Sequence, residues 1–353
     1  MDAEGAISCM KKAVIAVFMV VLLWANTALA AGQVSVLWDW QAPGEKASRL
    51  AEQEKLPGVS VLSPSWFVIA NEKGKIKDKK GTASLEYVRQ AHGQGYQVWA
   101  LITNDFNPDM TKKLLASPMG RANAIREMKS LAKKYQLDGI NIDFENIYPE
   151  DRDRLTDFVG EISRGLQAEG LTVSMDITIP SSSGMWSRCY DRRALAEQVD
   201  YLMLMAYDEH SAASEVSGSV ASLGWVEKGI VATIAEGVPP RKLLLGMPLY
   251  MRIWQEDIKT GKAKGKTLSM SQAEKLIGDR KLAPVWLPEA GQYYFEYTEG
   301  RSRYRVWQEN RRSLALKAAL VSRYDLAGGA YWRSTLETPD VWAALAQVMA
   351  AGR

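Results

Sequence analysis

Apolar residues in this chain gather in eight short runs, which polar residues and turn formers separate. The runs are rich in β-branched and aromatic residues, as buried strands are. The strands they predict span residues 33–40, 58–70, 96–103, 139–145, 171–179, 200–207, 242–250 and 328–333.

Between the strands, apolar positions recur with the spacing of amphipathic helices. The clearest of these stretches span residues 84–92, 120–135, 151–169, 219–236 and 313–324, and a final helix opens at Thr338, with Pro339 in its first turn, and runs through 341–349. Alternating strands and helices predict right-handed parallel crossovers, and eight such units predict a closed (β/α)8 TIM barrel. An open doubly wound sheet is disfavoured, because no glycine-rich phosphate loop follows the first strand.

One interval, from Arg252 to Asn310, is too long for a single loop. It contains a helical pattern at 271–277, with Ser271 and Glu274 as a candidate capping box, and a hairpin formed by residues 292–298 and 302–308. We predict a small α+β insertion, about residues 253–309, on the C-terminal face of the barrel, where it walls one side of a cleft.

The N-terminus has the pattern of an export signal. Lys11 and Lys12 precede an apolar run that leads to the small residues Ala28-Leu29-Ala30. This predicts a secretory signal over residues 1–31 that is cleaved near Ala30. A retained membrane anchor is the alternative, but the apolar core is shorter than the roughly 20 residues of a spanning helix. We therefore expect a secreted or envelope-associated protein with no membrane span after cleavage.

The composition excludes several classes of protein. Of 353 residues 47% are hydrophobic and 24% are charged, and the formal charge is only +3, which gives no reason to expect a nucleic-acid partner. Cys9 lies within the predicted signal, so Cys189 is the only cysteine of the mature chain, and it is accompanied by just His92 and His210. This set argues against a Cys/His zinc site. We expect a monomer that needs no metal and no cofactor.

Acidic residues interrupt one predicted strand. Residues 137–151 read LDGINIDFENIYPED. Strand side chains alternate between faces, so Asn141, Asp143 and Glu145 share one face and three apolar residues share the other. In a barrel the polar set points inward, and Glu145 emerges at the C-terminal end, where barrel active sites lie. Asp138 has the other parity and is expected to order the entry to the strand.

The spacing of these acids suits acid catalysis. Two carboxyl groups about 7 Å apart along one strand, with partial burial, raise the pKa of the outer one and keep Glu145 protonated near neutral pH. A protonated Glu can donate to the leaving oxygen of a glycoside. The second carboxylate of a glycosidase normally lies across the cleft and attacks the sugar or activates water. Asp143 lies behind Glu145 on the same strand, so the attacking group has to come from elsewhere.

The segment DGINIDFE (138–145) resembles the DxxDxDxE signature of family 18 glycoside hydrolases, the chitinase-like barrels. The segments LMLMAYDE (202–209), GMPLYMR (246–252) and GGAYWR (328–333) resemble three further motifs of the family, in the same order. The middle Asp of the signature is Asn141 here, which cannot ionise. With this change the chain resembles the bacterial spore-cortex and cell-wall N-acetylglucosaminidases.

The resemblance implies a substrate-assisted mechanism, in which the 2-acetamido group of the substrate makes the attack. It implies that Glu145 is the acid and later activates water, and that Asp143 orients the acetamido N–H. It also implies that Tyr207 hydrogen-bonds the acetyl oxygen, that Asp208 binds the sugar and that Trp332 forms the apolar floor beneath it.

Further residues are expected to contact the substrate because they lie at strand ends or in the insertion. Most tryptophans of a large protein are core residues, and Asn104 could equally be a turn cap. The candidates are Asn141, Tyr250, Arg252, Trp40, Trp66 and Asn104, with Trp286 as a weaker one.

The expected activity is that of a secreted, retaining hydrolase that cleaves β-1,4 bonds after N-acetylglucosamine in peptidoglycan or spore cortex. Chitin and chito-oligosaccharides are alternative substrates, since they carry the same acetamido group. A non-catalytic glycan-binding barrel is a less favoured alternative, because Glu145, Asp143 and Tyr207 are all present. An inhibitor-type barrel plugged by its own insertion also stays open.

Overall fold

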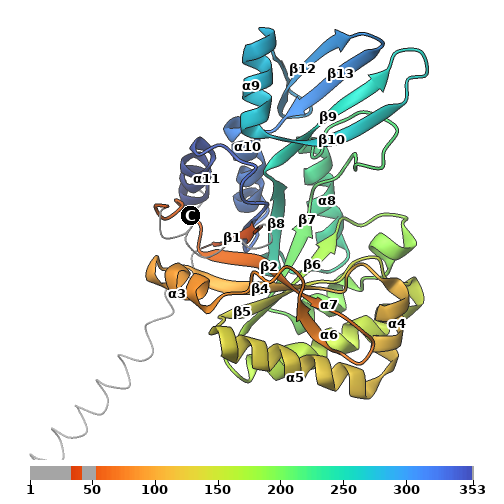
Figure 1. Cartoon of the computed structure of the whole chain (residues 1–353), viewed down its shortest axis with the longest axis vertical. Coiled ribbons are helices and arrows are strands. Elements are labelled where there is room, and N and C mark those ends of the chain that lie inside the picture. Colours follow the sequence, from red (N-terminus) through yellow and green to blue (C-terminus); the bar gives the residue numbers. More distant parts are fainter. Residues whose placement is uncertain (1–32, 42–52, 352–353) are drawn as a thin grey trace, which may run out of the picture. The chain divides into compact units, whose positions relative to one another are not determined.

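A computed structural model describes residues 33–41 and 53–351, so the predicted signal segment lies outside the described residues. Eight parallel strands form a barrel, which closes because β1 pairs with both β14 and β2 (Figure 1). In order around the barrel they are β1 (Val34–Asp39), β2 (Val61–Ile69), β4 (Gln97–Thr103), β5 (Gly139–Asp143), β6 (Thr172–Thr178), β7 (Tyr201–Met205), β8 (Leu243–Pro248) and β14 (Gly328–Trp332). The predicted (β/α)8 architecture and all eight strands are confirmed.

Helices cover the outside of this barrel. The predicted ones are α3 (Leu85–Gly93), α5 (Pro118–Tyr135), α6 (Arg152–Gln167), α8 (Leu223–Ala235), α10 (Arg311–Arg323) and α11 (Asp340–Ala351). The sequence pattern does not predict α4 (Pro108–Ala116) or α7 (Arg192–Gln198). Both are short, and α7 buries Arg192 at its first position, so its apolar stripe is too brief to recognise. Short helical turns lie at Pro149–Asp151, Gly184–Arg188 and Pro240–Lys242.

The hydrophobic core lies between the barrel and its helices. Ile140, Ile142 and Phe144 of the β5 segment all belong to it and are fully buried. Burial of each such side chain contributes about 1.5–3 kcal/mol, which pins the register of the strand. The alternate residues of β5 are thereby forced to face the barrel interior.

The predicted insertion is present beyond the end of β8 (Figure 1). Helix α9 (Met270–Arg280) accompanies a five-stranded antiparallel sheet made of β9 (Tyr250–Asp257), β10 (Ala263–Ser269), β11 (Val285–Leu287), β12 (Gln292–Glu299) and β13 (Ser302–Gln308). The hairpin prediction is confirmed by the β12–β13 pair. The predicted capping box is wrong: Ser269 and Gln272 form it, because α9 begins one residue before Ser271.

A buried ion pair joins the insertion to the barrel. Lys317 of α10 contacts both carboxylate oxygens of Glu309 at 2.8 and 2.9 Å, and both side chains are fully buried. Gln292 of β12 donates to Glu309 at 2.6 Å and accepts from Ser219 in the loop after β7. The network fixes the first residue of β12 to the end of β13 and to α10.

A short extra strand extends the sheet after β2. β3 (Ile76–Asp78) pairs antiparallel with the last three residues of β2, in the register of Phe67 with Asp78. The turn that follows is fixed by Asp78, whose carboxylate accepts hydrogen bonds from four backbone N–H groups of residues 80–83.

Of the helices in residues 33–41 and 53–351, none is long and apolar enough to span a lipid bilayer.

Candidate active site

The β5 segment presents its polar residues to the barrel interior, as its alternation predicts. Asn141 is fully buried, Asp143 is 7% exposed, and Glu145, just beyond the strand, is partly exposed. Asp138 accepts a hydrogen bond from Val98 N–H at 2.8 Å and contacts His92 at 2.7 Å. It therefore orders the entry to the strand, as predicted.

Asp143 and Glu145 interact directly. Their carboxyl groups lie within hydrogen-bonding reach of each other, so a proton on one of them can be shared by both. Burial raises the pKa of Asp143 from 3.8 to about 7. Burial also raises the pKa of Glu145 well above its usual range, and the negative charges of Asp143 and Asp208 add to the effect. The pair thus holds a proton at neutral pH, and Glu145 is its more exposed member.

A third acid, Asp176 of β6, lies beside this pair and is not predicted from the sequence. Its Oδ2 accepts a hydrogen bond from Asn141 Nδ2 at 3.0 Å, and Asn141 Oδ1 accepts one from Ser174 at 2.9 Å. Burial, and then the negative charge of Asp143, raise the pKa of Asp176 well above its usual range. Asn141 therefore bridges two acidic strands.

The three acids have no cationic partner among the described residues. The interactions that act on Asp143, Glu145 and Asp176 come from burial, from one another, from Asp208 and from neutral donors. Asp143 Oδ1 and Asp176 Oδ1 are buried and lack any hydrogen-bond partner in the described part of the chain. Unpaired carboxylates are costly to bury, so protonation is the available relief.

Tyr207 and Asp208 reach the same centre from the end of β7. Tyr207 is close enough to Asp176, Glu145 and Asp143 for their charges to raise its pKa, although burial is the main cause. The Tyr207 hydroxyl therefore keeps its proton and can act as a donor. Asp208 takes up a left-handed conformation with φ of 62°, which points to a geometric demand at this position.

Two residues of β9 hold Asp208. Its Oδ1 accepts hydrogen bonds from the Tyr250 hydroxyl at 2.6 Å and from Arg252 Nη2 at 2.7 Å. Arg252 also donates to the carbonyl of His210 at 3.2 Å. Tyr250 and Arg252 are thus bound to Asp208 rather than free, and their contact with substrate stays a prediction.

Trp332 ends β14 and packs edge-to-face against Trp38 of β1, with ring centroids 5.7 Å apart. It is partly exposed, as the predicted sugar floor requires. Trp40 is also partly exposed, but its ring is already contacted by two cations: Lys80 Nζ lies 2.9 Å and Arg333 Cζ 4.4 Å from the ring centroid.

Asn104 positions Glu145 instead of facing the substrate. It is fully buried, its Oδ1 accepts from Glu145 N–H at 3.1 Å, and its Nδ2 donates to the Glu145 carbonyl at 2.8 Å. The same Nδ2 reaches Thr111 Oγ1 at 2.9 Å. The prediction that Asn104 binds substrate is corrected, because both atoms of its amide are already used within the protein.

Trp66 is not at the mouth of the barrel either. β2 continues for three residues beyond it, and its side chain points outward into the core, against Tyr87 of α3 and Tyr135 of α5. Its indole N–H donates to Gln41 at 2.6 Å. Trp286, the weaker candidate, packs on Tyr293 within the insertion and lies beneath Arg312.

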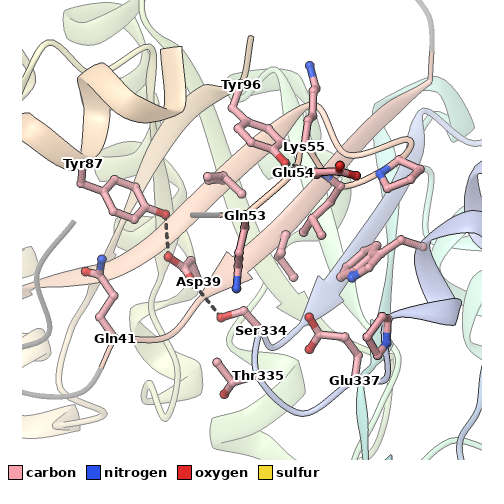
Figure 2. Close-up of a pocket in the computed structure, with 16 residues that line it drawn as sticks. Asp39, Gln41, Gln53, Glu54, Lys55, Tyr87, Tyr96, Ser334, Thr335 and Glu337 are labelled. Carbon is pink, nitrogen blue, oxygen red and sulfur yellow. Dashed lines mark hydrogen bonds between the residues drawn. The ribbon is translucent and has the colours of Figure 1, made fainter. Parts of the chain in front are cut away.

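A separate cavity of about 470 Å³ lies outside the barrel, lined by β1, α3 and the chain around α11 (Figure 2). None of the predicted site residues lines it. Asp39 at its wall accepts hydrogen bonds from the Tyr87 and Ser334 hydroxyls, each at 2.6 Å.

Within residues 33–41 and 53–351, no cluster of three or more His, Cys, Asp or Glu side chains could hold a metal ion.

Comparison with known proteins agrees with this geometry. The family model of the glycosyl hydrolases family 18 matches residues 38–337. The putative sporulation-specific glycosylase YdhD of Bacillus subtilis is 31% identical over 69% of this chain and 58% of its own length. The cortical fragment-lytic enzyme of the same organism is 28% identical over 70% of this chain and 59% of its own length.

Among solved structures, a chitinase from Chromobacterium violaceum superposes with a TM-score of 0.79 and 25% identity, over 90% of this chain and 99% of its own. The chain spans less than two thirds of the two Bacillus relatives, whereas the family match covers residues 38–337 of its 353 residues. The chain belongs to the glycosyl hydrolases of family 18.

Proposed function

We propose that this protein is a retaining hydrolase that cleaves β-1,4 bonds after N-acetylglucosamine, with the substrate's own acetamido group as the nucleophile. One arrangement carries the proposal. Glu145 lies just beyond the end of β5 and is partly exposed, and buried acids without cationic partners among the described residues hold a proton behind it.

In the first step Glu145 donates its proton to the glycosidic oxygen as the bond to the leaving sugar breaks. A raised pKa suits this role, because a general acid is most effective when its pKa lies near the working pH. Asn104 holds the backbone of Glu145 from both sides, which keeps the acid in place.

At the same time the acetamido carbonyl oxygen attacks the anomeric carbon and forms an oxazolinium-like ring. Asp143 accepts the acetamido N–H, so its negative charge stabilises the positive charge of the ring. The Tyr207 hydroxyl donates to the acetyl oxygen, and Trp332 supports the apolar face of the sugar. In the second step Glu145, now deprotonated, takes a proton from water, which opens the ring with net retention.

The state of Asp208 argues against the usual mechanism with two carboxylates. A carboxylate that attacks a sugar must be free to form a bond. Asp208 is a candidate, since its charge reaches Glu145, but its Oδ1 is bound by Tyr250 and Arg252. Its role in the proposal is therefore to fix these two residues and to contact the sugar.

Asp176 has a role apart from that of Asp143. Asn141 stands where the DxxDxDxE signature of the family has an ionisable Asp, and it cannot exchange a proton. Through Asn141, the Asp176 carboxyl is linked to the strand that carries Asp143. We propose that Asp176 keeps its own proton throughout, so that Asp143 is the acid that carries the negative charge facing the oxazolinium-like ring.

For the substrate, we propose peptidoglycan, and spore cortex in particular. The names of the cortical fragment-lytic enzyme and of the sporulation-specific glycosylase support this choice. Chitin is the second candidate, supported by the similarity to a chitinase. Both polymers contain the acetamido group that the mechanism needs.

Mass spectrometry of the products of spore-cortex fragments and of chitohexaose tests this proposal. We expect cortex fragments to be cut on the reducing side of N-acetylglucosamine, so that this sugar forms the new reducing end. We also expect them to be cut faster than chitohexaose. Turnover of chitohexaose alone would refute the peptidoglycan assignment. If neither substrate is cut and Glu145→Gln binds them as the native chain does, the protein is a glycan-binding barrel.

We also propose that residues 1–31 form a cleaved export signal, on the basis of their sequence pattern. N-terminal sequencing of the protein recovered from culture medium or cell envelope tests this. A mature chain that begins close to Ala31 is expected, whereas an intact N-terminus in the membrane fraction would mean that the segment is an anchor.

A further inference from the structure

Two cations share a single tryptophan ring at the rim of the barrel. Lys80 and Arg333 both lie over Trp40, within the range of cation–π contacts. The three side chains come from the end of β1, the turn after β3 and the end of β14, so they meet only in the folded chain. All three residues are partly exposed.

The backbone around this cluster is firmly held. Trp40 N–H donates to Ser334 Oγ at 3.0 Å, and Ser334 N–H donates to the Trp38 carbonyl at 3.0 Å. Ser334 Oγ in turn donates to Asp39, as Figure 2 shows. The segment that carries Trp40 is therefore fastened to the segment that carries Arg333.

The position of Lys80 is fixed as well. Asp78 accepts four backbone N–H groups of the turn at residues 80–83, including that of Lys80 itself. The Lys80 ammonium also lies 3.5 Å from the Gln41 carbonyl. The turn after the β2–β3 hairpin thus holds the Lys80 ammonium at one position on the rim of the barrel.

No acidic residue in the described part of the chain balances the charge of Lys80 and Arg333 through a salt bridge, whereas the neighbouring Lys79 pairs with Asp105. Burial, and then the positive charges of Arg333 and Lys79, lower the pKa of Lys80 to about 8. Two mutually repelling cations held together are a site for an anion, because a bound carboxylate would relieve their repulsion.

The cluster adjoins the catalytic floor. Arg333 directly follows Trp332, and Trp40 is two residues beyond Trp38, against which Trp332 packs. A polysaccharide whose acetamido sugar rests on Trp332 would extend over this rim. Chitin offers no charge there, but in peptidoglycan both neighbours of each N-acetylglucosamine are N-acetylmuramic acid, with a lactyl carboxylate or an acidic peptide attached to it.

We propose that Lys80 and Arg333, held on Trp40, form a subsite for the carboxylate of a muramic acid unit next to the cleaved N-acetylglucosamine. This inference rests on the proposed function, the hydrolysis of an acetamido glycan, and it specifies that the glycan is peptidoglycan. It makes this rim the feature that separates peptidoglycan from chitin, which the catalytic residues cannot do.

Binding to Glu145→Gln protein, which does not consume its ligand, provides the test by calorimetry. The first ligand is a tetrasaccharide of alternating N-acetylglucosamine and N-acetylmuramic acid with free lactyl carboxylates. The second is the same compound with these carboxylates methyl-esterified, and a third carries an L-Ala-D-Glu dipeptide on the lactyl group. Chitotetraose reports on the neutral glycan.

We expect the free acid to bind about tenfold more tightly than its ester, and the preference to shrink in 1 M salt. Lys80→Gln and Arg333→Gln, each in the Glu145→Gln background, should reduce the preference to less than threefold. Lys79→Gln is the matched control, because that lysine already has a partner, and it should keep the preference. Tighter binding of the dipeptide ligand than of the free acid would place the recognised carboxylate on the peptide.

Equal affinity for acid and ester would overturn the subsite, as would a preference that survives both substitutions. Binding of chitotetraose without binding of either muramic ligand would also overturn it, while leaving the hydrolysis of acetamido glycans intact. If none of the four ligands binds, the glycan substrate itself is wrong.

Discussion

Replacement of Asp143 by Asn should stabilise the protein at alkaline pH while it abolishes activity. Burial raises the pKa of Asp143 above its ordinary value, so the folded protein binds a proton there more tightly than the unfolded chain does. Between the two pKa values the folded state therefore holds more protons, and the stability contributed by this site falls as the pH rises. The amide introduced by Asp143→Asn carries no charge at any of these pH values, so the variant would escape this loss.

The size of the effect follows from the site. The pKa of Asp143 moves from 3.8 to about 7, and each pH unit of difference is worth about 1.4 kcal/mol, so the loss reaches about 4 kcal/mol above pH 7. The group is only 7% exposed, so solvent screening reduces this value little. Because Asp143, Glu145 and Asp176 interact, the titration belongs to the three acids together.

Urea unfolding of the native chain and of Asp143→Asn at intervals from pH 4 to pH 8 measures this difference. The free energy of unfolding of the variant minus that of the native chain should increase steadily as the pH rises. Asp157→Asn, at an exposed position of α6, is the control and should show no such trend. A stability difference that is independent of pH would refute the argument that Asp143 is buried without compensation.

Three further substitutions have defined outcomes. Glu145→Gln should lower kcat by about 10³-fold or more with the fold intact by circular dichroism, because it removes the general acid; a loss below tenfold would contradict the assignment. Asn104→Ala should lower kcat by about 10²-fold, because the backbone of Glu145 loses its support, and an unchanged kcat would show that the clamp is dispensable. Lys317→Met should lower the free energy of unfolding by about 3–5 kcal/mol in urea, since Glu309 is left buried and unpaired. The double variant Lys317→Met/Glu309→Leu should regain much of the lost free energy of unfolding. If it does not, the destabilisation by Lys317→Met has a cause other than the unpaired Glu309.

Much of the fold can be predicted because burial enforces periodicity. Along β5 the alternation of Ile140, Ile142 and Phe144 with polar residues predicts which side chains face the interior, and β6 shows the same alternation. Parallel strands separated by helices then leave few topologies. Short elements such as α7 escape prediction because about two turns of helix offer too few apolar positions to show a period.

The site could be predicted where residues adjoin in sequence, and less well where folding brings them together. Asp143 and Glu145 are two residues apart in the sequence, at the end of β5 and just beyond it, whereas Asp176 joins them from β6 through its bond to Asn141. A signal for Asp176 exists, since it is an acid on the inward parity of an apolar strand, between Val173 and Ile177.

Side-chain direction at strand ends could not be predicted. Trp66 and Asn104 both lie close to the expected mouth of the barrel, yet one packs outward and the other supports a backbone. Whether such a residue points at the cleft depends on where its strand ends. That depends on tertiary pairing, such as the contact of β3 with the last residues of β2.

The most direct test of the account is to remove the acetyl group on which the proposed attack depends. Initial rates should be measured for a tetrasaccharide of alternating N-acetylglucosamine and N-acetylmuramic acid, and for the same compound with free amines on its glucosamine units. We predict that the free-amine substrate is cleaved at least about 10³-fold more slowly, since it has no group that can attack from within. Equal rates for the two substrates would contradict substrate-assisted catalysis at Glu145.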